Sequence, residues 1–176
     1  MRRTQKAAAI VAGALFTLGA GSGIGAQQPA AVKQPAKSAA TSKHVMVTPG
    51  DLQWGPGPPG LPAGAQAAVI DGDPGKAGLF TLRAKLPDGY RIPPHSHPTD
   101  EHVTVLSGTL KAGSGAKWDD ASMHPLTAGG YAKMVKGVNH YVAAQGETII
   151  QVTAMGPFLI TYADPKDDPR KKTAAN

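Results

Sequence analysis

Two histidines and one glutamate are spaced so that they could bind a metal ion together. His95 and His97 are two residues apart, and Glu101 follows His97 by four. Alternate side chains of an extended chain point to the same side, so these even offsets place two imidazoles and one carboxylate on one face. Pro93 and Pro94 precede the pair and hold the approach extended.

A third imidazole could come from His140, which lies in a second strand-like run, residues 139–143. Three neutral nitrogens and one carboxylate suit a divalent first-row metal such as Mn, Fe, Ni, Cu or Zn. Four protein ligands would leave open positions for water, substrate or dioxygen, and the metal could act as a Lewis acid or activate bound water. The single carboxylate leaves the site at about +1, which favours an anionic or chelating ligand. A His-x-His pair alone occurs often by chance and is more typical of surface histidines in a Pro-rich turn than of a metal site.

The whole spacing is more specific than the histidine pair. Gly89, five residues, His95, one residue, His97, three residues, Glu101, six residues and Gly108 is the order of the first conserved motif of the cupin family. The chain therefore resembles a small single-domain bacterial cupin. The resemblance implies a small antiparallel jelly-roll barrel with the metal inside its mouth, bound by the two histidines, Glu101 and a histidine of the second motif.

The second cupin motif is matched in part. Gly129, Gly137 and His140 occupy their motif positions, whereas Val135 replaces the usual proline and Ala144 the usual asparagine. The glycine of the turn and the metal histidine are present. The differences at Val135 and Ala144 therefore bear on how tight the turn is more than on whether a metal binds. The resemblance, flanking strands included, covers about two-thirds of the chain.

The elements that must position these residues are predicted to be strands. Helix signals are scarce, and Gly 22 and Pro 16 punctuate the chain. Residues 79–86 alternate, with Phe80, Leu82, Ala84 and Leu86 on one face. The predicted strands cover residues 45–48, 67–71, 79–86, 101–107, 131–135, 139–143, 148–154 and 158–162. Many short strands separated by turns indicate an all-β sandwich or barrel.

A glycine pattern before the first long strand looks like a dinucleotide-binding loop. Gly55, Gly57 and Gly60 have the G-x-G-x-x-G spacing, but four interleaved prolines prevent the helix that would have to follow. We therefore predict a Pro/Gly arm lying over the body of the protein.

The remaining histidines receive structural interpretations. His102 is adjacent to Glu101 and so points to the opposite face, His124 is predicted to lie in a loop, and His44 lies at the end of a linker. Further side chains could line the pocket, although none stands out: Tyr90, Arg91, Tyr131, Tyr141 and Met134.

The composition of the ends predicts export. Residues 1–26 combine three basic residues with an uncharged, weakly apolar stretch that ends in small residues, which is typical of a signal peptide and less so of a retained membrane anchor. Residues 27–43 predict a disordered linker, 44–165 the barrel domain, and 166–176 a flexible tail. We expect a periplasmic or secreted protein with no stable membrane insertion after cleavage.

The charge distribution argues against nucleic-acid binding. The formal charge is +6, but residues 44–169 hold 9 basic and 12 acidic residues, and only the ends are basic. Aromatic residues make up 5%, too few for a base-stacking surface. The absence of cysteine excludes disulfides and thiolate metal sites.

Two functions remain open. The first is a metal-dependent oxidoreductase, of dioxygenase or oxidase type, acting on a small and anionic molecule, with Glu101 as a catalytic group that could also take a proton. The second is a non-catalytic metal- or ligand-binding module or sensor. The resemblance also implies a homodimer.

Overall fold

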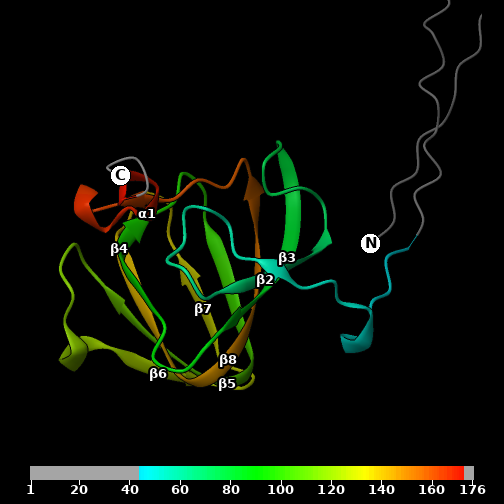
Figure 1. Ribbon diagram of the computed structural model, residues 1–176, viewed down its shortest axis with the longest axis horizontal. Coiled ribbons are helices and arrows are strands. Elements are labelled where there is room, and N and C mark those ends of the chain that lie inside the picture. Colours follow the sequence, from blue (N-terminus) through cyan, green and yellow to red (C-terminus); the bar gives the residue numbers. More distant parts are fainter. Residues whose placement is uncertain (1–43, 173–176) are drawn as a thin grey trace, which may run out of the picture. The chain divides into compact units, whose positions relative to one another are not determined.

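The computed structural model describes residues 44–172 (Figure 1). The predicted signal peptide (1–26) and linker (27–43) lie outside the described residues. Within residues 44–172, no helix is long and apolar enough to cross a membrane.

The described part of the chain contains nine strands, and their pairings are antiparallel. They are β1 (Gly55–Pro56), β2 (Gln66–Asp71), β3 (Gly78–Leu86), β4 (Arg91–Ser96), β5 (Glu101–Ser114), β6 (His124–Thr127), β7 (Tyr131–Met134), β8 (His140–Gly156) and β9 (Thr161–Tyr162). The helical elements are short: η1 (Pro49–Asp51), η2 (Asp120–Ser122), η3 (Pro165–Asp167) and α1 (Pro169–Lys172).

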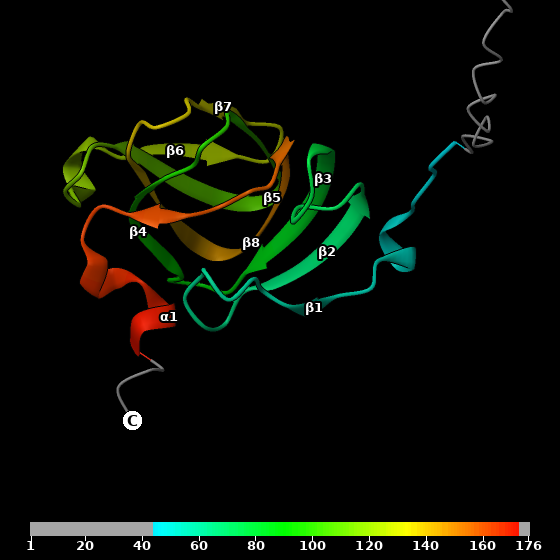
Figure 2. The same cartoon turned by 90° about the horizontal axis from the view of Figure 1, so that it is seen from above.

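The strands form one curled sheet in the order β1-β2-β3-β8-β4-β9, and β5 pairs with β6, β7 and β8. The first part of β8 pairs with β4 and the second part with β3, while β5 runs along most of β8. Figures 1 and 2 show the sheet curling round to enclose its own inner face. The predicted all-β, antiparallel jelly-roll barrel with little helix is confirmed.

The two long strands turn a corner together. The β5–β8 register shifts on either side of Ser107, and residues 106–108 and 145–147 at this corner are exposed. Gly108 and Gly146 have φ of 75° and 72°, a conformation that favours glycine. The separate strands predicted at 139–143 and 148–154 are therefore two parts of β8, bent at Gly146.

The alternation of β3 builds the core as predicted. Phe80, Leu82, Ala84 and Leu86 are buried, whereas Leu79 on the other face is exposed. The neighbouring strands contribute buried side chains from the same inner face: Val103, Val105, Leu110, Ile150, Val152 and Ala154. These side chains form the hydrophobic core of the barrel.

The strand predictions need four corrections. Residues 45–48 are not in a strand, and of 158–162 only Thr161–Tyr162 is. His124 begins strand β6, because its backbone pairs with Ala112 of β5. The sequence does not predict strand β4, since Pro93 and Pro94 lack the N–H groups of a regular ladder. The β4–β8 register shifts between Ile92 and His95, and this irregularity accommodates both prolines.

The C-terminal segment contacts the barrel. Where the sequence predicts a flexible tail from residue 166, η3 and α1 are formed and Asp168 is buried. The guanidinium of Arg170 binds both carboxylate oxygens of Asp168 at 2.8 Å and donates to the carbonyl oxygen of Ile160 at 3.0 Å. This segment therefore reaches the rim of the barrel.

Candidate metal centre

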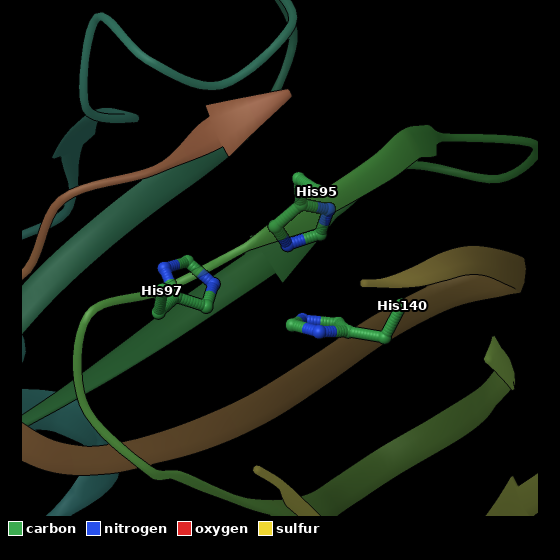
Figure 3. Close-up of side chains that lie close together, drawn as sticks. All are labelled: His95, His97 and His140. Carbon is green, nitrogen blue, oxygen red and sulfur yellow. The ribbon is translucent and has the colours of Figure 1, made fainter. Parts of the chain in front are cut away.

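Three buried imidazoles converge inside the barrel. His95 lies near the end of β4, His97 just beyond it, and His140 begins β8, where it is the register partner of His95. One ring nitrogen from each lies within 4.8 Å of the others, and the three side chains are 3–6% exposed. Figure 3 shows the rings facing one another between the two strands.

Backbone carbonyls orient two of the rings locally. The Nδ1 atom of His95 lies 2.8 Å from the carbonyl oxygen of Pro93, and that of His140 lies 3.2 Å from the carbonyl oxygen of Val138. A carbonyl only accepts, so each Nδ1 carries a proton, and in the neutral imidazole Nε2 is then the atom with the lone pair. The Nε2 atom of His140 is buried without a hydrogen-bond partner among the described residues. Such an orphaned acceptor fits a metal ion, which would use the lone pair.

A distant segment orients the third ring. The Nδ1 atom of His97 donates to the carbonyl oxygen of Leu159 at 2.7 Å, and the ring stacks on Phe158 at 4.1 Å between centroids and 15° between planes. The Nε2 atom of His97 is thereby also left for a ligand. Phe158 and Leu159, which follow β8, thus orient the imidazole of His97, which follows β4.

Glu101, the first residue of β5, brings a carboxylate to the same place. Its Oε2 atom lies 3.5 Å from Nε2 of His97 and 3.4 Å from Nε2 of His140, and the residue is 9% exposed. Adjacent ligands on one octahedral ion, each about 2.1 Å from it, stand about 3 Å apart. The structure thus places the Glu101 carboxylate beside the three converging imidazoles, which by themselves form a group that could hold a metal ion.

Burial favours the neutral form of the His95 and His97 imidazoles. Burial, followed by the charges that His140 and His97 would carry, lowers the pKa of His95 to about 3. Burial also lowers the pKa of His97, although the Glu101 carboxylate and the Leu159 carbonyl oppose it. Metal-binding imidazoles must be deprotonated, so these shifts keep the site ready for a cation near neutral pH.

His102 points away from the site, as its odd offset from Glu101 predicts. Its Nδ1 atom lies 2.6 Å from the hydroxyl oxygen of Tyr131 on the outer face of the sheet.

The turn before His140 is tight despite Val135. The N–H of Val138 donates to the carbonyl of Val135 at 3.1 Å, and Gly137 has φ of 72°. The N–H of Gly137 donates to the carbonyl of His97 at 2.9 Å, which ties the turn to the other side of the site. Valine therefore serves in place of the motif proline.

Ala144, which replaces the motif asparagine, is held by its main chain. Its N–H donates to the carbonyl of Tyr90 at 2.9 Å, and its carbonyl accepts from the N–H of Gly89 at 3.1 Å. A side-chain amide is not needed for this contact.

A cavity of about 440 Å³ lies beside the cluster, and His95, His97 and Glu101 form part of its wall. The rest of the wall is mostly apolar and comes from β2, β3, β4, β8, α1 and three loops: Pro58, Pro59, Gly60, Leu61, Ala67, Pro74, Gly75, Leu82, Ala84, Leu86, Ile92, Ile150, Val152, Phe158, Leu159, Ile160 and Arg170. His140 lines a second cavity of about 450 Å³.

The predicted pocket-lining residues are corrected by the structure. Tyr90, Arg91, Tyr131 and Tyr141 do not line the first cavity, and Met134 lines the second. The hydroxyl of Tyr141 instead lies 2.7 Å from that of Ser122, because alternation turns its ring away from His140. The actual wall includes Phe158 and Arg170, which no motif or periodicity indicates.

The predicted Pro/Gly arm covers this cavity. The hydroxyl of Tyr162 donates to the carbonyl of Gly60 at 2.7 Å, and that of Tyr90 donates to the carbonyl of Pro62 at 2.5 Å. Burial raises the pKa of Tyr162 to about 12, so this donor keeps its proton. No helix follows the glycine pattern, which excludes a dinucleotide-binding loop here.

One family model matches this chain. It is described as a domain of unknown function, DUF4437, and it covers residues 47–164. No curated protein matches the chain.

Solved structures with the same fold are numerous. A candidate acetylacetone dioxygenase from Methylibium petroleiphilum is similar with a TM-score of 0.57 and 17% identity, over 77% of this chain and 96% of that one. The polyketide cyclase RemF from Streptomyces resistomycificus gives 0.56 and 16%, over 75% and 94%. An RmlC-like cupin from Shewanella frigidimarina gives 0.50 and 16%, over 65% and 91%. The expected cupin fold is confirmed.

Proposed function

Because the chain belongs to the DUF4437 family and has the cupin fold, we propose that it is a metal-dependent oxidoreductase, of dioxygenase or oxidase type, that acts on a small anionic molecule. The observation that carries the proposal is the convergence of His95, His97, His140 and Glu101 beside a cavity large enough for a small ligand. The proposed oxidant is dioxygen.

The residues of the chain divide the work. The three neutral imidazoles and Glu101 would hold one divalent metal of the Mn, Fe, Ni, Cu or Zn group, with the Nε2 atoms as ligands. The metal would supply Lewis-acid or redox chemistry when bound. The apolar wall keeps water from the substrate, which strengthens each electrostatic contact inside the cavity.

Glu101 is also proposed to move a proton. Its carboxylate is the acidic group in the cavity wall nearest to the imidazoles, and it could accept a proton from a substrate bound beside it. In Glu101→Gln the amide keeps the shape and loses the basicity. We expect this variant to turn over at least ~100-fold more slowly. Normal metal content together with normal turnover would remove this role.

Elemental analysis of untagged protein produced in its own host tests the metal, and oxygen uptake tests the chemistry. We expect about one redox-active metal per chain and oxygen consumption with a suitable substrate. His140→Ala is the control, and equal metal in both proteins would refute the four-ligand site. Zinc without oxygen uptake would instead favour the alternative, a non-catalytic metal- or ligand-binding module.

We also propose export to the periplasm or beyond, and a homodimer. The basic, then uncharged, sequence of residues 1–26 supports export. N-terminal sequencing of mature protein that begins near Gln27 would support cleavage, and an intact Met1 would oppose it. Gel filtration of the mature form at twice the mass of the chain is the result expected for the dimer.

A further inference from the structure

The cavity beside the metal centre has an apolar floor. Leu82, Ala84 and Leu86 project into it from β3, and Ile150 and Val152 from the paired part of β8. These positions alternate along their strands with residues on the outer face, so the apolar floor follows directly from the period of the two strands.

The roof of the cavity is apolar too. Leu61 of the Pro/Gly arm, Phe158 and Ile160 also line the cavity and are called its roof. The arm lies close to this segment, because a Cβ atom built on Gly60 would stand 2.5 Å from Cγ2 of Ile160. A ligand body between floor and roof would therefore meet hydrocarbon on both sides.

Polar side chains are few in this wall, as far as residues 44–172 show. Three belong to the metal centre, and the fourth is Arg170 at the rim. Its guanidinium makes two hydrogen bonds to the carboxylate of Asp168 and one to the carbonyl of Ile160, so an acid of the same segment balances its charge. Strong polar recognition inside the cavity is thus concentrated at the metal centre.

Charge at the metal centre defines the head of the ligand. Three neutral imidazoles, one carboxylate and a divalent ion sum to about +1. A monoanion neutralises this charge, whereas a dianion would leave an excess buried charge in an apolar cavity.

We propose that the cavity takes a monoanionic molecule with one oxygen-rich head and an apolar body, the head at the metal centre and the body between β3, β8 and the roof. The head rests on the proposed function, whereas the apolar body rests on the cavity alone. Polyhydroxylated acids are excluded, because each hydroxyl buried against this wall loses its hydrogen bonds to water.

Isothermal titration of the full mature protein with simple monoanions tests this proposal. The probes are acetate, butyrate, hexanoate and octanoate, with gluconate as a six-carbon, polyhydroxylated match to hexanoate. Each is titrated into metal-free and Zn²⁺-loaded protein, since Zn²⁺ has no redox chemistry of its own. We expect Kd to fall about fourfold per methylene in both forms. Zn²⁺ should tighten every alkanoate, and gluconate should bind at least ~10-fold more weakly than hexanoate.

The two parts of the proposal can fail separately. Affinity that does not depend on chain length, or gluconate binding as tightly as hexanoate, would overturn the apolar body and leave the metal function standing. A chain-length dependence without any effect of Zn²⁺ on affinity would overturn the anionic head at the metal centre, whereas the metal site itself stands or falls by the elemental analysis.

Matched cavity-filling variants locate the binding. Ala84→Leu adds three carbons to the floor, and we expect octanoate to bind at least ~10-fold more weakly while acetate changes less than ~2-fold. Ala132→Leu makes the same change in the second cavity and should leave the series unchanged. Thermal melting and Zn²⁺ stoichiometry establish that both variants are folded. Unchanged octanoate binding by Ala84→Leu would place the acyl chain elsewhere and refute the proposal.

Discussion

Metal-free protein should lose stability steeply below pH 6.5, because buried imidazoles cannot be protonated without cost. Burial lowers the pKa of His95 from its ordinary 6.5 to about 3 in the folded state. Between these values the unfolded chain binds a proton that the folded chain does not, so the free energy of unfolding falls as the pH falls. The slope is about 1.4 kcal/mol per pH unit, and His95 alone should cost about 2 kcal/mol between pH 7 and pH 5.

Urea unfolding of the chelator-treated protein at a series of pH values measures this loss. The lowered pKa of His97 acts in the same direction and steepens the slope. In His95→Gln the side chain cannot titrate. We therefore expect the slope of the free energy of unfolding against pH to be smaller by the contribution of one proton, about 1.4 kcal/mol per pH unit. His44 is exposed and precedes the first strand of the barrel, so His44→Gln should keep the slope of the parent protein. A free energy of unfolding that is constant between pH 6.5 and pH 5 would refute the buried neutral cluster.

Three further predictions concern single positions. His140→Ala removes a ligand, so metal affinity measured by competition with a chelator should fall more than ~100-fold, beyond what loss of an outer partner costs; affinity within a few-fold of the parent would contradict its role. Phe158→Leu removes the ring that stacks on His97, and we expect metal affinity about 10-fold weaker with little change in thermal melting; an unchanged affinity would show that Leu159 alone holds the imidazole. A Cβ atom at Gly113 would overlap the buried ring of Tyr141, so Gly113→Ala should destabilise the protein by about 1–3 kcal/mol in urea unfolding; Gly55→Ala, whose Cβ atom would meet nothing within 4 Å, should cost less, and equal losses would contradict the overlap.

The metal cluster could be predicted because its signal is local. His95 and His97 lie two residues apart at the end of β4, as the period of two predicts, but the chain bends at Pro98 and Thr99 and Glu101 begins the separate strand β5. The Glu101 carboxylate therefore reaches the imidazoles after a bend and not along one extended face. The register of β4 with β8 then places His140 opposite His95. A strand that contains two prolines in succession could not be predicted from its propensity, because its irregular pairing depends on β8.

The cavity wall could be predicted only in part. The inner face of β3 follows from alternation, and so does the outward direction of Tyr141. Phe158 and Arg170 reach the wall through contacts with His97 and Asp168 that no spacing in the sequence encodes. Long-range contacts of this kind arise from the closed barrel and not from the periodicity of any one segment.

The orientation of the three rings depends on main-chain oxygens, and this decides which parts of the chain can disturb the site. The acceptors for His95 and His140 lie two residues earlier in the same segments. Each of these rings is therefore oriented by its own segment and moves with it. The acceptor for His97 lies 62 residues away, at Leu159. A change that shifts the segment after β8 would therefore turn His97 while leaving the other two rings in place. Because Phe158 and Leu159 also line the cavity, a ligand that displaces this segment would act on the metal centre through His97.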